Sequence, residues 1–139
     1  MIRIMTISDY DDVYALWQAT PGMGLNDVDD SRDGIEKYLK RNPGTCFVAE
    51  QGGCIVGAVL GGHDGRRGYI CHLAVAEDCR RQGIGRVLVD AVMTAFEDEG
   101  IIKAALVVFE SNRRGNDFWE KMGFASRGDL VYRNKVVGN

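Results

Sequence analysis

The stretch Tyr69–Phe96, YICHLAVAEDCRRQGIGRVLVDAVMTAF, decides how the rest of this chain folds. Its opening part, Tyr69–Val75, is apolar and rich in strand formers, which predicts a mostly buried strand. Its closing part, Gly83–Phe96, has the apolar spacing of one helix face, at Ile84, Leu88, Ala91, Val92, Ala95 and Phe96. The residues between them, Arg80–Gly85, form a glycine-bearing turn from strand to helix.

This turn is a candidate anion site. The first amides of a helix have no partner within the helix and lie at the positive end of its dipole. Gly83 and Gly85 lack a Cβ, so a phosphate could approach the backbone closely. Positive charge surrounds the turn at Arg80, Arg81 and Arg86. The turn alone leaves two interpretations open, a phosphate-binding loop and an ordinary helix start with solvated arginines.

Two better-known phosphate motifs do not fit this turn. A P-loop needs Gly-Lys-Ser/Thr, and a dinucleotide-binding Rossmann turn needs a third glycine and a later acid. The pattern Arg80-x-x-Gly83-x-Gly85, after a strand that ends Leu73-Ala74-Val75, resembles the acetyl-CoA signature of the GNAT N-acetyltransferases.

Length and composition indicate one globular domain, residues 1–139, with 45% apolar and 27% charged residues. No apolar run approaches the roughly 20 residues that span a bilayer, and the N-terminus lacks a signal-peptide core. We therefore expect a cytoplasmic protein without membrane association. The net charge of −3 argues against a general nucleic-acid binder.

Four cysteines and two histidines without a C-x-x-C pair argue against a metal site and favour reduced thiols. Cys46, Cys54 and Cys71 lie in or beside apolar stretches, so we expect them to be small core residues.

The first half of the chain predicts a strand at Ile2–Ile7, followed by a helix capped by Ser8 with Asp11. Ser31 is expected to cap a second helix that runs through Leu39. Apolar runs at Thr45–Glu50 and Cys54–Leu60 flank Gln51-Gly52-Gly53, a hairpin signal. With Tyr69–Val75 these runs predict an antiparallel meander.

After the helix, Ile101–Phe109 reads as a strand parallel to Tyr69–Val75, which completes a β–α–β unit. A short helix is expected at Asn112–Met122 and a last strand at Leu130–Val137. The fold class is therefore α+β, a mostly antiparallel sheet with one parallel pair and helices on both faces.

A second motif, Asn112–Phe124, is similar to the GNAT segment N-x-x-A-x-x-x-Y-x-x-x-G-F, with Asn112, Gly123 and Phe124 in place. The resemblance then covers essentially the whole chain. It implies a single GNAT-type domain whose parallel strands splay apart to admit acetyl-CoA, with no metal. It also implies a primary amine as acceptor, on a small molecule or a protein, and leaves monomer and homodimer both open.

The resemblance also implies roles for particular residues. The pyrophosphate of CoA would be held at the turn, at Arg80, Arg81, Gln82, Gly83, Ile84, Gly85 and Arg86. The pantetheine arm would pair with the backbone of Leu73 and Val75, and Asn112 would contact the arm or its covering helix. The Val75 amide would stabilise the oxyanion that forms when the amine attacks the thioester directly in a ternary complex.

The sequence departs from the family at two catalytic positions. Trp119 stands where many members have a tyrosine that protonates the leaving thiolate, and an indole N–H is not a practical acid. Tyr69 stands where some relatives have a glutamate base. An alternative function is therefore a catalytically silent acyl-CoA sensor or interaction module. An enzyme does not require the tyrosine, because a thiol of pKa near 8.5 can leave without an acid, and Trp119 would then simply pack against pantetheine.

Two further sets of residues carry hypotheses about the acceptor. His72 has the side-chain type whose ordinary pKa is closest to neutrality, so it is either a base for the ammonium substrate or a strand histidine with a satisfied hydrogen bond. Asp27 and Asp30, with neighbouring acids on the segment 21–33, would favour a cationic substrate if that segment borders the cleft. The alternative is a solvated acidic loop with no role in selection.

Overall fold

The computed structural model describes residues 1–138, which gather into two compact units. The first unit, Met1–Phe109, contains a five-stranded sheet and the helices packed on it. The second unit begins at Glu110 and contains α4 (Arg113–Lys121).

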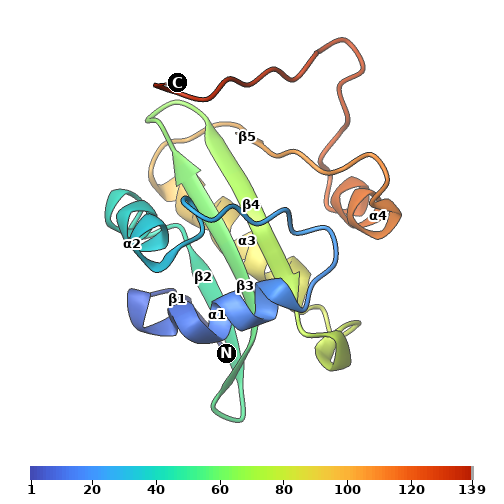
Figure 1. Ribbon diagram of the computed structural model, residues 1–139. Coiled ribbons are helices and arrows are strands. Elements are labelled where there is room, and N and C mark those ends of the chain that lie inside the picture. Colours follow the sequence, from blue (N-terminus) through green and yellow to red (C-terminus); the bar gives the residue numbers. More distant parts are fainter. Residues whose placement is uncertain (139) are drawn as a thin grey trace. The chain divides into compact units, whose positions relative to one another are not determined.

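The sheet has the strand order β1-β2-β3-β4-β5 (Figure 1). Its strands are β1 (Ile2–Ile4), β2 (Phe47–Gln51), β3 (Cys54–His63), β4 (Gly68–Val75) and β5 (Ala104–Ala105). The first four strands form an antiparallel meander, and β5 runs parallel to β4 after the crossover helix α3 (Ile84–Asp98). The α+β class, with one parallel pair in a mostly antiparallel sheet, is confirmed.

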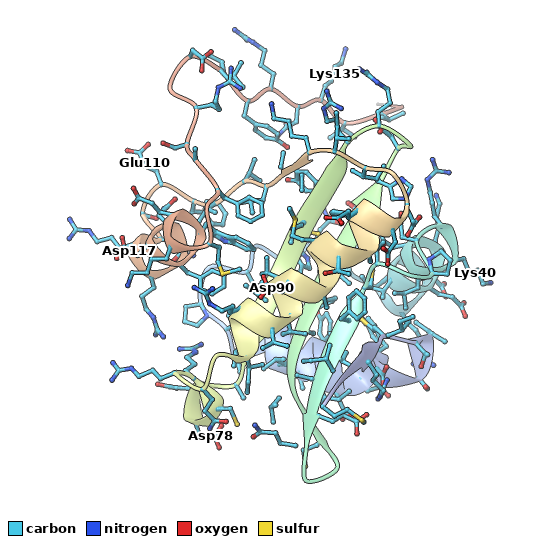
Figure 2. The ribbon with its side chains drawn as sticks, turned by 180° about the vertical axis from the view of Figure 1, so that it is seen from behind. Lys40, Asp78, Asp90, Glu110, Asp117 and Lys135 are labelled. Atoms are coloured by element: carbon cyan, nitrogen blue, oxygen red, sulfur yellow. The ribbon has the colours of Figure 1, made fainter. Side chains whose placement is uncertain are left out.

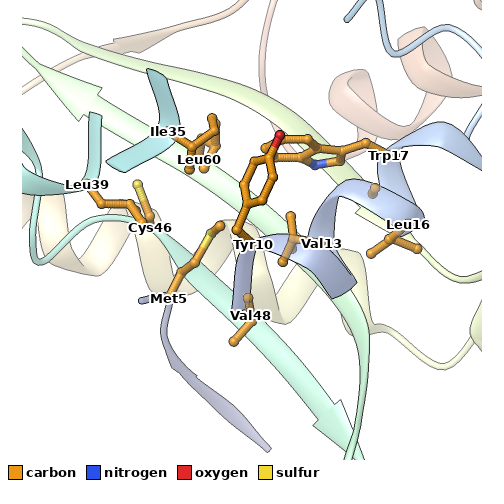
Figure 3. Close-up of a cluster of buried hydrophobic side chains, with 12 residues drawn as sticks. Met5, Tyr10, Val13, Leu16, Trp17, Ile35, Leu39, Cys46, Val48 and Leu60 are labelled. Carbon is orange, nitrogen blue, oxygen red and sulfur yellow. The ribbon is translucent and has the colours of Figure 1, made fainter. Parts of the chain in front are cut away.

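Helices cover both faces of this sheet. On one face, α1 (Tyr10–Gln18) and α2 (Arg32–Arg41) bury an apolar cluster against the strands (Figure 3). The cluster consists of Met5, Tyr10, Val13, Leu16, Trp17, Ile35, Leu39, Cys46, Val48, Ala58, Leu60 and Ala74. On the other face lies α3 (Figure 2).

Glycines in β3 and β4 allow α3 to approach the sheet closely. A Cβ on Gly61 would lie 2.6 Å from the carbonyl oxygen of Thr45 and 2.7 Å from Val92 of α3. A Cβ on Gly68 would lie 2.5 Å from the Phe96 ring. Helix α3 is therefore held closely against β3 and against β4, the strand that precedes it in the chain.

The starts of the first two helices differ in how well the sequence predicts them. Ser31 caps α2 as expected, since its Oγ accepts from Gly34 N at 3.0 Å. The prediction that Ser8 caps the first helix is wrong, because a 3-10 turn (Ile7–Asp9) precedes α1. The Asp9 carboxylate accepts from Thr6 N at 2.9 Å at the start of this turn. Arg3 of β1 also donates to both Asp9 oxygens, at 2.8 and 2.9 Å. This guanidinium holds the pKa of the buried Asp9 below its usual value.

Four other sequence predictions are corrected by the structure. The first strand ends at Ile4 rather than Ile7, and the strand expected over Ile101–Phe109 is reduced to Ala104–Ala105. The expected strand at Leu130–Val137 is absent from the described residues. A strand needs a hydrogen-bonded neighbour, and the part of the second unit that the structure describes has no other strand to supply one. Cys54, expected in the core, is exposed at the hairpin.

Candidate functional site

The strand β4 contains a bulge. Its pairing with β3 slips by one residue between the pairs Ala58–Ala74 and Leu60–Cys71, which leaves an extra residue on β4. At this point His72 has a φ of +54°, a left-handed conformation that is uncommon for residues other than glycine. Such a conformation costs on the order of 1–3 kcal/mol and gathers at functional sites. The bulge therefore marks β4 as a candidate site.

Beyond the bulge, β4 presents backbone groups to the side away from β3. Ala76 N donates to Val56 O at 2.7 Å, and bonded positions alternate along an antiparallel pair. The amides of Leu73 and Val75 therefore point away from β3. On that side, within residues 1–138, β5 pairs only with the first two residues of β4. An extended ligand could add to this open edge as a further strand.

The turn that follows β4 leads into α3, whose N-terminus has no side-chain cap. Arg81 and Gly83 have φ values of +67° and +79°, and α3 then begins at Ile84. Gly83 has no side chain to cap the helix, so the first amides of α3, including those of Gly85 and Arg86, lack intrahelical partners. A Cβ on Gly83 would meet no atom within 4 Å, so the turn is open on that side.

Polar and basic side chains surround the turn. Arg80 Nε donates to the Val75 carbonyl at 3.2 Å, which ties the turn to the end of β4. Arg81 and Arg86 are exposed, and Gln82 accepts from the Gln51 side chain at 2.9 Å. Free amides, a helix dipole and these cations together favour a bound anion.

Comparisons with known proteins show the family of this chain. The model of the acetyltransferase (GNAT) family matches residues 10–124. The chain belongs to the GNAT acetyltransferase family.

Relatives of this GNAT chain span nearly its whole length. An acetyltransferase of Pectobacterium atrosepticum is 34% identical over 98% of this chain and 95% of its own. The solved structure of Ard1 from Thermoplasma volcanium is 25% identical, with a TM-score of 0.80 over 90% of this chain and 82% of Ard1. AAC(6')-Iy, solved with a bisubstrate analogue, CoA-S-monomethyl-acetylneamine, is 20% identical, with a TM-score of 0.77 over 98% and 97% of the two chains.

The second unit carries the other GNAT motif. Asn112 caps α4, since its Oδ1 accepts from Gly115 N at 2.9 Å. Trp119 is half-buried between Phe118 and Phe124, with both pairs of ring centroids 5.1 Å apart and nearly perpendicular. Within its own unit, the indole at the tyrosine position of the family thus has an aromatic packing role.

Two of the residues proposed to act on the acceptor amine, His72 and Asp30, are in contact. The ring of His72 meets the carboxyl of Asp30, with Nε2 and Oδ1 2.8 Å apart. Asp30 is buried, whereas Asp27 is exposed. Asp30 is thus held inside the protein, and only Asp27 of the two is a solvated charge. Sequence analysis identified both His72 and Asp30 as candidates, but nothing in their spacing indicated that they are in contact.

Burial makes the neighbouring thiol of β4 a poor nucleophile. It raises the pKa of Cys71 to about 12, so the thiol keeps its proton at neutral pH. Among residues 1–138 there is no cluster of three or more His, Cys, Asp or Glu side chains that could hold a metal. The helices in that part of the chain are also too short or too polar to cross a bilayer.

Proposed function

We propose that residues 1–139 form a single N-acetyltransferase domain that transfers the acetyl group of acetyl-CoA to a primary amine. The observation that carries this proposal is the open edge of β4 leading into the uncapped, arginine-flanked start of α3. The pyrophosphate of CoA binds the amides of Gln82–Arg86, and the pantetheine arm pairs with Leu73 and Val75. No metal takes part.

The reaction is a direct attack within a ternary complex. The amine nitrogen bonds to the thioester carbon, negative charge builds on the carbonyl oxygen, and the Val75 amide stabilises it. Holding the amine beside the thioester supplies much of the remaining acceleration, an effect worth several kcal/mol. The protonated thiol of Cys71 argues against an acyl intermediate on that residue.

The second motif adds two residues to this proposal. Asn112 fixes the start of α4, and Trp119 packs against pantetheine. Because a thiol has an ordinary pKa near 8.5, the CoA thiolate leaves without a dedicated acid at the Trp119 position.

The test is a calorimetric titration with acetyl-CoA followed by a thiol-release assay over a panel of small amines and peptides. Micromolar binding and amine-dependent thiol release are expected. Binding without release on any amine would favour the acyl-CoA sensor, which the indole at Trp119 also suggests. No binding at millimolar acetyl-CoA would refute both functions.

A further inference from the structure

Asp30 and His72 form a pair that is held from several directions. Oδ2 of Asp30 accepts from Asn26 N at 2.7 Å, and its Oδ1 lies 2.8 Å from Nε2 of His72. The carbonyl oxygen of Asp30 accepts from the buried Tyr10 hydroxyl at 2.6 Å. Trp17 packs edge-on against the imidazole, with ring centroids 4.9 Å apart. The ring is therefore fixed in both position and plane.

The hydrogen bond decides which ring nitrogen can accept a proton. A carboxylate oxygen only accepts, so a neutral His72 donates to Asp30 through Nε2–H. The other nitrogen, Nδ1, then carries a lone pair and has no hydrogen-bond partner among residues 1–138. The side chain of His72 is 17% exposed and that of Asp30 only 7%, so the imidazole is the more accessible member of the pair.

The position of His72 on β4 suits this role. With the pyrophosphate at the turn, the pantetheine arm runs back along β4 toward the bulge, so that its thioester lies beside Leu73 and Val75. The thioester end of the arm thus approaches the residue that the bulge holds in a left-handed conformation. A regular strand would not require such a backbone, so the strain singles out this position as a candidate functional one.

We infer that His72 takes the proton from the substrate ammonium through Nδ1 and that Asp30 is the positioning residue that orients and polarises the ring. This inference rests on the proposed function. The ammonium loses one proton to Nδ1, and the freed lone pair attacks the thioester carbon. The C–N bond forms and the C–S bond breaks. The second proton of the nitrogen passes to the CoA thiolate through solvent, and His72 releases its proton to water.

The experiment compares His72→Gln, Asp30→Asn and the control Asp12→Asn, which removes an exposed carboxylate from α1. The probes are the ε-amino group of an Nα-blocked lysine peptide and the α-amino group of a lysine-free peptide. At about pH 8 roughly half of an α-amine is neutral, against less than about 1% of an ε-amine. A base therefore matters most for the ε-amine.

Both site variants should lower kcat on the ε-amine about 100-fold or more and less on the α-amine. The KM for amine and the Kd for acetyl-CoA should stay within about threefold of wild type, as should every constant of Asp12→Asn. His72→Gln is decisive because glutamine can still donate to Asp30 but cannot take up a proton.

Wild-type kcat in His72→Gln would show that the contact is structural and overturn the inference. So would equal losses on both amines together with weaker acetyl-CoA binding. Wild-type enzyme that binds acetyl-CoA but acetylates neither probe would also overturn it. Failure of wild type to bind acetyl-CoA refutes the proposed function itself, which is a different outcome from all of these.

Discussion

Substitution of Gly83 separates the steric from the electrostatic demands of a pyrophosphate site. Gly83 has a φ of +79° and open space around its missing Cβ, so larger side chains fit without collision. Each substitution costs on the order of 1 kcal/mol of left-handed strain. A glutamate carboxylate about 5 Å from a phosphate adds roughly 3 kcal/mol of repulsion at an effective dielectric constant near 20. That repulsion corresponds to about a 100-fold weaker Kd.

Calorimetry with acetyl-CoA measures this difference. The glutamine of Gly83→Gln has the same shape as the glutamate of Gly83→Glu but carries no charge. The ratio of their dissociation constants for acetyl-CoA therefore isolates the charge repulsion, and this ratio should shrink as added salt screens the repulsion. Gly65→Glu is the control, since Gly65 also has a positive φ (+92°) and open space, in the hairpin before β4. Equal affinities in Gly83→Glu and Gly83→Gln at low salt would refute the placement of the pyrophosphate, as would an equally weak Gly65→Glu.

Three other predictions concern stability and the leaving group. Gly61→Ala should lower the free energy of unfolding by about 1–3 kcal/mol in urea, because its Cβ would lie 2.6 Å from the carbonyl oxygen of Thr45. Gly57→Ala should cost less, because its nearest neighbours are side-chain atoms at 3.0 and 3.1 Å and its nearest backbone atom, the Ala74 oxygen, is at an ordinary contact distance of 3.4 Å. An equal cost at both positions would contradict this close approach. Asp9→Asn should lower the free energy of unfolding by about 1–3 kcal/mol at neutral pH. The pKa of the Asp9 carboxylate is lowered in the folded protein, so its contribution to stability is present above the ordinary pKa of 3.8 and is lost as the pH falls through the lowered value. The urea midpoints of wild type and Asp9→Asn should therefore converge in acid. Trp119→Tyr should change kcat by less than about tenfold in the thiol-release assay, since the thiolate leaves without an acid; a larger gain would show that an acid is needed.

The sequence predicted most of the sheet because its signals are local. Alternating or continuous apolar runs separated by glycine turns are sufficient for the β2–β3–β4 meander, and the cap at Ser31 depends on residues close in sequence. Strand pairing beyond the meander depends on distant partners. Ile101–Phe109 and Leu130–Val137 have strand-like composition, but composition does not show where the neighbour that would pair with them lies.

The same distinction applies to the candidate site. The turn at Arg80–Arg86 could be recognised because glycines, arginines and a helix start are contiguous. The contact between Asp30 and His72 joins residues 42 positions apart, and it depends on the bulge of β4. A bulge of one residue changes which side of a strand each later side chain faces, and strand alternation in the sequence does not show it.

Transfer itself is tested most directly by mass spectrometry of both products. Acetyl-CoA carrying a deuterated acetyl group is incubated with the protein and a primary amine that supports thiol release. The account predicts one deuterated acetylamide for each CoA thiol released and no label on the protein. Thiol release without acetylated amine, or label retained on Cys71 or any other side chain, would contradict direct transfer from acetyl-CoA to the amine.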